Sequence, residues 1–150
     1  MKKIITVMLT FLFLTSCGYT PIYFNKNFDF NIKDITISKN DQLSYKTKKM
    51  LLALSNQNSQ RIIYLDLDVQ KKTNVITKNS KGDPSRYEMV INIQLDITYN
   101  KDQKIRSSFK ENFNYNENIN KFELSQYTKE IEDLLINQNI DRIIIYLSKI

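Results

Sequence analysis

The sequence of 150 residues contains no histidine, no tryptophan and a single cysteine. Without histidine, the chain cannot form the Ser-His-Asp or Cys-His arrangements that activate nucleophiles, nor zinc sites built from histidine and cysteine. A lone cysteine also excludes a disulfide within the chain. Only two glycines occur, so there is no glycine-rich phosphate-binding loop. We therefore expect a protein that is not an enzyme and that binds no metal or cofactor.

Carboxylates are the remaining candidates for acid–base chemistry. Asp66 and Asp68 alternate with two leucines, as on the solvent face of a strand. A second group, on a predicted helix surface among lysines, consists of Glu130, Glu132 and Asp133. We interpret both groups as solvated charges rather than catalytic residues.

The first residues have the order of a secretion signal. Two lysines precede an apolar stretch, residues 4–14, and Leu14-Thr15-Ser16-Cys17 ends this stretch with small residues before the cysteine. A transmembrane helix needs ~20 apolar residues, and this stretch is about half as long. We expect the signal peptide, residues 1–16, to be cleaved and Cys17 to carry the lipid. A multi-acyl anchor of this kind, with palmitate among its chains, would hold the protein firmly to a membrane.

The part that follows the signal is long enough for one domain. We assign residues 17–30 to a lipidated tether and residues 31–150 to that domain. Without Lys2 and Lys3, 20 of the 22 basic residues remain, against 16 acidic residues. Export argues against nucleic acid as a partner, and the sequence contains no nucleic-acid-binding motif. The polyanions outside the cytoplasmic membrane are phospholipid and lipopolysaccharide headgroups.

Periodicity predicts six elements in the order β-α-β-β-β-α. The first strand, residues 32–38, follows a change of alternation phase near Lys33-Asp34 that requires a bulge or break. A helix follows, capped by Ser38, Asn40 or Asp41. One face of this helix carries Leu43, Thr47, Met50, Leu51 and Leu54.

The strongest strand pattern lies in the middle of the chain. Every odd position from Tyr87 to Tyr99 is apolar, and the even positions are polar except Val90. The strand before it, residues 61–69, alternates in the same way and extends into a polar stretch that ends in a loop. A turn at residues 100–103 leads to a returning strand. That strand carries Ile105, Phe109, Phe113 and Tyr115.

The C-terminal segment, from about Glu123, has apolar residues at helical spacing despite the β-branched run Ile143-Ile144-Ile145. We expect a helix with a kink near residues 137–139. These elements predict an α+β fold, a two-layer α/β sandwich. Its mixed or antiparallel sheet has two helices packed on one face, which leaves the other face polar.

Three features of the sequence occur together. The mature chain would open with Cys17-Gly18-Tyr19-Thr20-Pro21-Ile22-Tyr23. A small polar loop, within Gly82-Asp83-Pro84-Ser85-Arg86-Tyr87-Glu88-Met89, precedes an aromatic residue that begins a long alternating strand. With the order of elements, these motifs resemble the alphaproteobacterial LPS-assembly lipoproteins of the LptE type. Phe24 departs from the family, whose opening often has glycine there, and this difference concerns only the tether.

The resemblance implies a function without catalysis. A lipoprotein of this type lies in the outer membrane on its periplasmic side. It plugs an LptD-like outer-membrane β-barrel, assists its assembly and takes part in lipopolysaccharide delivery to the cell surface. A polar outer face would suit a wet barrel lumen, although low-GC composition bias gives the same richness in asparagine and lysine. The alternative is a stand-alone periplasm-facing lipoprotein that binds a lipid or peptide ligand.

The resemblance also indicates where lipopolysaccharide would be contacted. Family members use basic residues near the loop before the long strand and near the start of the last helix. The matching positions here are Lys78, Lys81, Arg86 and Lys121. Lipid A phosphates would accept charge-assisted hydrogen bonds from these side chains. The alternative for each residue is an ordinary surface cation.

Overall fold

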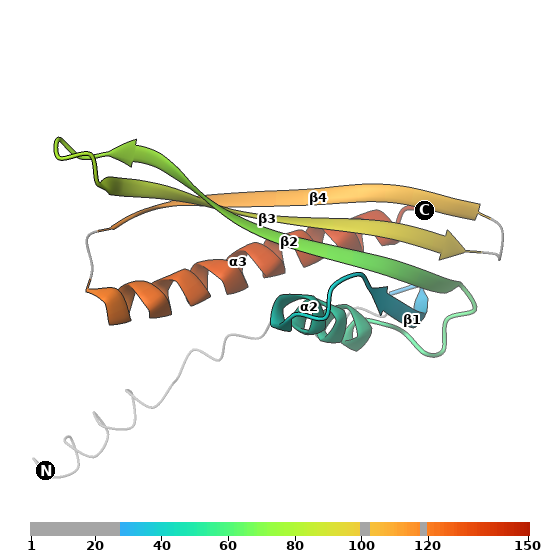
Figure 1. Ribbon diagram of the computed structural model, residues 1–150. Helices are drawn as coiled ribbons and strands as arrows, with labels where there is room; N and C mark the ends of the chain where they lie inside the picture. Colours follow the sequence, from blue (N-terminus) through green and yellow to red (C-terminus); the bar gives the residue numbers. More distant parts are fainter. Residues whose placement is uncertain (1–27, 100–102, 118–119) are drawn as a thin grey trace, which may run out of the picture.

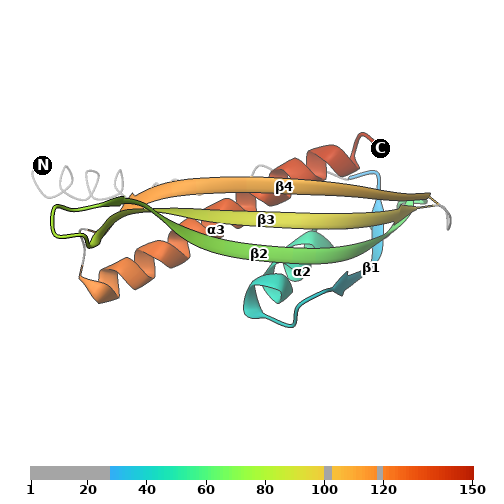
Figure 2. The ribbon, with the colours of Figure 1, turned by 45° about the horizontal axis from the view of Figure 1, so that its top comes forward.

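The computed structural model describes residues 28–99, 103–117 and 120–150. Its four strands form one sheet in the order β1-β2-β3-β4, with β1 parallel to β2 and the other neighbours antiparallel. Both helices lie on the same face of this sheet (Figures 1 and 2). The predicted α+β sandwich and its order of elements are therefore confirmed. In chain order, the elements are β1 (Asn31–Ile37), α2 (Gln42–Ala53), β2 (Ile62–Lys78), β3 (Pro84–Tyr99), β4 (Gln103–Asn116) and α3 (Lys121–Leu147).

The core begins before the predicted domain boundary at residue 31. The signal, Cys17 and the tether up to residue 27 lie outside the described residues. Phe28 and Phe30, which we assigned to the tether, are 9% and 0% exposed, and their rings stack at 5.6 Å. Two aromatic side chains from the end of the predicted tether therefore belong to the core.

Strand β1 is short and irregular, as its change of alternation phase predicts. Its pairing register with β2 shifts between Ile32 and Asp34, and this shift allows both Ile32 and Ile35 to be buried. The strand pairs only with the first part of β2, from Ile62 to Leu67. The rest of β2 therefore extends beyond β1.

Helix α2 is capped by Asp41, one of the three predicted caps. The Asp41 carboxylate accepts a hydrogen bond from the Ser44 backbone N–H at 2.8 Å, and this bond lowers the pKa of Asp41. Thr47 and Leu51 on the predicted face are buried. The other members of that face are partly buried against the core. Ser44, which the apolar spacing does not reveal, is buried as well.

Strand β3 forms the centre of the sheet. Its odd positions from Met89 to Ile97 are at most 3% exposed and face the helices, as predicted. Val90 points to the other face and is nevertheless only 8% exposed. It lies between its cross-strand partners Lys72 on β2 and Asn112 on β4, on a central strand with neighbours on both sides.

Helix α3 crosses the apolar face of the sheet. Asn120 caps it by accepting hydrogen bonds from the N–H groups of Phe122 and Glu123. The helix continues without interruption through residues 137–139, where we expected a kink. Asn139 is fully buried there, and its Nδ2 donates to the carbonyl oxygens of Leu135 and Ile91. Among the described residues, no helix is both long and apolar enough to cross a bilayer.

Candidate functional site

The sheet face turned away from the helices carries mostly polar side chains. We call it the polar face; it comprises every second residue from Tyr64 to Asn74, Glu88 to Thr98 and Lys104 to Asn114. Each of these β3 side chains lies opposite one from β2 and one from β4. Its four acidic side chains are matched by four basic ones, so the face as a whole carries no net charge. These charged residues are Asp66, Asp68, Glu88 and Asp96, with Lys72, Lys104, Arg106 and Lys110.

Ion pairs organise one end of the polar face. Asp66 and Asp96 are direct cross-strand partners, a placement in which two carboxylates repel. Arg106 removes this conflict by donating two hydrogen bonds to Asp96, at 2.6 and 2.8 Å. Lys104 lies 3.5 Å from both carboxylates. The Arg106 guanidinium therefore lowers the pKa of Asp96 to about 2.

Amide groups organise the other end of the polar face. Glu88 accepts hydrogen bonds from Asn112 at 2.7 Å and from Asn74 at 3.1 Å, one from each neighbouring strand. These bonds, with the one from Asn112 the stronger influence, lower the pKa of Glu88. Between the two ends, Ser108 donates to Asn92 at 2.7 Å. The polar face is therefore a cross-strand hydrogen-bonded surface that is ordered before any partner binds.

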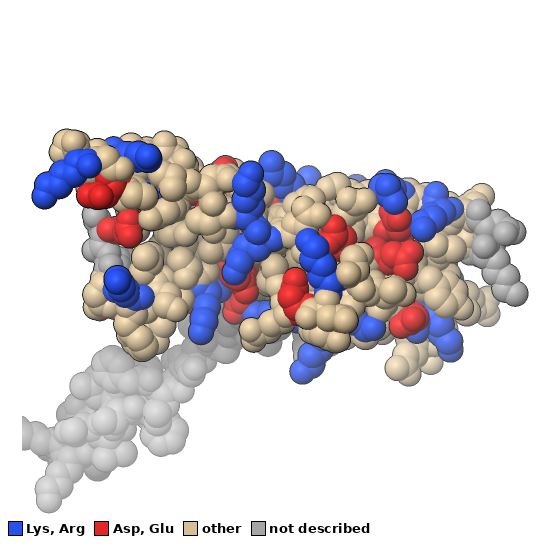
Figure 3. Space-filling model, viewed as in Figure 1, with Lys and Arg blue, Asp and Glu red and all other residues tan. Residues whose placement is uncertain are grey.

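The structure brings the four predicted basic residues to one end of the molecule. Lys78 ends β2, Lys81 lies in the turn that follows, Arg86 lies near the start of β3, and Lys121 begins α3. All four are exposed, and none forms an ion pair with another described residue. The hairpin tip and the start of α3 project from this end (Figure 1), where Figure 3 shows basic side chains. We call these four residues the basic end.

The turn of the basic end has a defined shape. The Asn79 Oδ1 accepts hydrogen bonds from the N–H groups of Lys81 and Asp83, at 2.9 and 3.0 Å. Gly82 has a φ of 89°, a conformation that side chains with a Cβ rarely adopt. Lys81 therefore projects from an ordered turn, although its role in binding remains a prediction.

Of the carboxylates that we interpreted as solvated charges, all but Glu130 form ion pairs with described residues of other segments. Glu132 on α3 contacts Lys71 on β2 at 2.6 Å, and Asp133 pairs with Lys46 on α2. Sequence spacing places these residues on outward-facing surfaces but does not identify their partners, because the partners come from distant segments. Among the described residues, no cluster of potential ligands could hold a metal ion.

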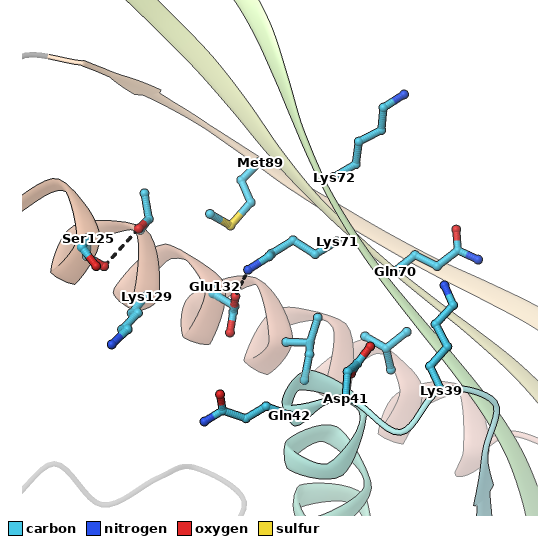
Figure 4. Close-up of a pocket in the computed structure, with 13 residues that line it drawn as sticks. Lys39, Asp41, Gln42, Gln70, Lys71, Lys72, Met89, Ser125, Lys129 and Glu132 are labelled. Atoms are coloured by element: carbon cyan, nitrogen blue, oxygen red, sulfur yellow. Dashed lines mark hydrogen bonds and ion pairs between the residues drawn. The ribbon is translucent and has the colours of Figure 1, made fainter. Parts of the chain in front are cut away.

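A groove that the sequence did not reveal lies beside β2. Its volume is about 780 Å³, and it lies between the sheet, the start of α2 and the first half of α3 (Figure 4). Four consecutive residues of β2, from Val69 to Lys72, line it, which places the groove along the edge of that strand. The Lys71–Glu132 pair crosses it. The only sequence signal was that the second predicted strand, with its polar extension, is longer than the first.

Comparison with solved structures identifies the fold. The chain matches rare lipoprotein B from Shewanella oneidensis with a TM-score of 0.55 and 11% identity, over 77% of this chain and 94% of that chain. A minor lipoprotein from Acinetobacter baumannii matches with a TM-score of 0.55 and 12% identity, over 81% and 92%. An uncharacterized lipoprotein B from Nitrosomonas europaea matches with a TM-score of 0.59 and 10% identity, over 81% and 83%. The chain has the fold of these bacterial lipoproteins.

The similarity is one of structure and not of sequence. No protein-family model matches the chain, and no curated protein sequence matches it significantly. Identities of 10–12% carry information about the fold alone. The biochemical role therefore has to be argued from the surfaces described above.

Proposed function

We propose that this chain is a lipid-anchored envelope protein of the LptE type that acts by binding. In this proposal it plugs an LptD-like outer-membrane β-barrel, assists the assembly of that barrel and takes part in lipopolysaccharide delivery. The observation that carries the proposal is the polar face, which has no net charge and is ordered by cross-strand hydrogen bonds. The lipoprotein fold of the neighbours supports the same class of role.

The chemistry of the polar face suits the interior of a wide barrel. Such a lumen is polar and filled with water, so a plug needs side chains that hydrogen-bond directly or through water. Asparagine, glutamine and serine side chains do this without the desolvation cost of an unpaired charge. Charged groups that are already bonded to each other within the face, such as Arg106 and Asp96, bring no unpaired charge into the interface.

The length of the sheet also suits a plug. With a rise of about 3.4 Å per residue, the 16 residues of β3 extend for roughly 50 Å. The hydrocarbon core of a bilayer is about 30 Å thick. A sheet of this length, placed along a barrel axis, would line the full height of the lumen and project beyond it.

The basic end supplies the second part of the proposal. Lys78, Lys81, Arg86 and Lys121 are exposed and have no described ion-pair partner, so their charges are available to an anionic ligand. Lipid A phosphates would accept charge-assisted hydrogen bonds from them. In this arrangement the polar face contacts the barrel, and the basic end contacts the lipopolysaccharide.

A pull-down from solubilised outer membrane tests the proposal. The full-length chain with a C-terminal tag is expected to recover one large β-barrel at equal stoichiometry. Replacing Asn92 and Gln94 in the middle of the polar face with glutamate should reduce that recovery, because it places unpaired charges in the interface. The matched control places glutamate at Asn137 and Gln138, which are exposed on α3. Recovery of the chain without any barrel would refute the plug and favour the stand-alone lipoprotein.

A further inference from the structure

Strand β2 has an open edge along more than half its length. It has 17 residues, but β1 pairs only with those from Ile62 to Leu67. The last backbone contact on this side is the bond from the Ser38 N–H to the Leu67 carbonyl oxygen, at 2.9 Å. After that point the chain turns away into α2. Within the described residues, no strand pairs with this edge from Val69 onward, so alternate backbone groups there have no ladder partner.

The groove described above lies along this open edge. A strand added to β2 would lie about 4.8 Å away from it. It would occupy, beside the later residues of β2, the position that β1 occupies beside Ile62 to Leu67. Alternate side chains of the added strand would then point into the groove, towards the first half of α3. At the base of the groove, Leu43, Val69 and Met89 form an apolar contact for one such side chain. The cavity of about 780 Å³ provides room for side chains of this kind.

The charge around the groove indicates what kind of strand fits. Four lysines line the groove, Lys39, Lys71, Lys72 and Lys129, against two carboxylates, those of Asp41 and Glu132. Lys71 is already paired with Glu132, but Lys72 and Lys129 have no ion-pair partner among the described residues. Lys39 is 3.9 Å from Asp68 and more than half exposed. Lys72 lies on the polar-face side of the open edge, with Lys39 close to Asp68 of that face, whereas Lys129 lies on the helix side. An added strand with acidic side chains on both of its faces would therefore meet a lysine on each side.

We propose that the open edge of β2, from Val69 to Val75, accepts an extended acidic segment of a partner polypeptide as an additional strand. Backbone hydrogen bonds supply the affinity, and the lysines and the apolar base select the side chains. The edge available for pairing ends at Val75, because the bulge between Val75 and Thr77 interrupts the regular strand there. This inference goes beyond the proposed function, since it holds for any partner that offers such a segment.

A second copy of this chain is a poor occupant of this edge. The opposite edge of the sheet is β4, whose polar-face side chains include Lys104, Arg106 and Lys110. Pairing that edge with β2 so that the two polar faces are continuous would bring these basic residues beside Lys72, which lies on the same face. Beside β4, Arg142 of α3 bonds to Glu111 at 2.6 Å and reaches the Lys110 carbonyl oxygen at 3.5 Å. The two edges therefore differ, and β4 provides an internal control.

The test uses the full-length protein in neutral detergent and a labelled ten-residue peptide. In this peptide, pairs of glutamates alternate with pairs of threonines around one central valine, so that both faces of the extended chain carry glutamate. Two control peptides are used. One carries lysine in place of glutamate, and the other carries N-methyl groups at alternate backbone nitrogens. We expect saturable binding of the acidic peptide, with at least tenfold weaker binding of both controls. Hydrogen exchange should slow at alternate amides from Val69 to Val75 and stay unchanged in β4.

Charge variants test the electrostatic part of the inference. Lys72→Glu and Lys129→Glu should each weaken peptide binding about three- to tenfold at low salt. Lys49→Glu on α2, an exposed lysine without a described ion pair and outside the groove, should leave binding unchanged. Each variant is checked by circular dichroism for unchanged secondary structure.

Several outcomes would overturn the inference. Equal binding of the N-methylated peptide would mean that no strand forms, and protection of β4 would place the strand at the wrong edge. Protection of Val69 to Val75 by phosphatidylglycerol micelles but not by peptide would assign the groove to a lipid headgroup. The peptide assay contains no barrel, and the pull-down contains no peptide. Failure of one proposal is therefore distinguishable from failure of the other.

Discussion

Asn139 is the one asparagine in the described core, and its substitution offers a sharp test of the packing between helix and sheet. Its side chain is fully buried between α3 and β3. The Nδ2 donates at 2.9 Å to Leu135 and at 3.3 Å to Ile91, and both acceptors are backbone carbonyl oxygens. The Oδ1 is buried and has no hydrogen-bond partner among the described residues. The surroundings of this side chain therefore offer two hydrogen-bond acceptors, both carbonyl oxygens, and no hydrogen-bond donor.

Asn139→Asp should be strongly destabilising. The substitution keeps the shape of the side chain but replaces the donor with a carboxylate oxygen that faces two carbonyl oxygens. An unpaired buried charge costs about 3–5 kcal/mol of unfolding free energy, or the group takes up a proton instead. The pKa of the new carboxyl should therefore be raised. Its cost to stability should be largest above that pKa and should decrease as the pH falls through it.

Asn139→Leu should behave very differently. It removes both hydrogen bonds, worth about 0.5–1.5 kcal/mol each, but also removes the unsatisfied Oδ1, whose burial costs about 1–3 kcal/mol. The two contributions nearly cancel, so the free energy of unfolding should change by less than about 1.5 kcal/mol. Urea unfolding followed by circular dichroism measures both variants. Asn137→Asp is the matched control, since it makes the same chemical change at an exposed position of the same helix.

A loss of stability for Asn139→Leu as large as that for Asn139→Asp would refute this reasoning. It would mean that the two hydrogen bonds, and not the avoidance of a buried charge, determine the choice of residue. A cost below about 1 kcal/mol for Asn139→Asp would mean that water reaches the site.

Three further predictions concern charged side chains. Because Arg106 lowers the pKa of Asp96 to about 2, below its ordinary 3.8, stability should fall as the pH drops from about 4 to 2. Asp96→Asn should remove this part of the pH dependence of the urea midpoint, and an unchanged profile would contradict the assignment. Asp41→Ala should cost about 0.5–2 kcal/mol through loss of the α2 cap, whereas Asp41→Asn should keep most of the stability in the same assay. Lys81→Glu with Lys121→Glu should weaken binding to lipopolysaccharide micelles with an unchanged circular dichroism spectrum; unchanged binding would exclude the basic end as the site.

The alternation of apolar residues was sufficient to predict the sheet. The odd positions of β3 from Met89 to Ile97 are buried because a strand places every second side chain on one face, and this rule depends only on local sequence. The bulge near Lys33-Asp34 followed from the same rule. Helical spacing similarly identified α3 in spite of Ile143-Ile144-Ile145. Burial of Ile143 and Ile144, with Ile145 49% exposed, is what a turn of 3.6 residues requires.

What the sequence did not reveal depends on contacts between distant segments. No local pattern indicates that β1 covers only the first part of β2, so the groove and the open edge were not predicted. The partners of Asp96, Glu132 and Asp133 were missed for the same reason. The burial of Asn139 was missed because an asparagine within a helical pattern suggests a kink. The positions of Lys78, Lys81, Arg86 and Lys121 at one end could be read from the order of elements.

The balance of charge on the polar face determines how binding to this face responds to ionic strength. Its acidic and basic side chains are equal in number and several are bonded to one another, so added salt has little net attraction to screen there. The basic end carries uncompensated charge, and attraction to an anionic ligand weakens as the Debye length falls from about 10 Å at 0.1 M to about 3 Å at 1 M salt. A wash at high salt should therefore release ligands held by the basic end and leave in place a partner held by the polar face.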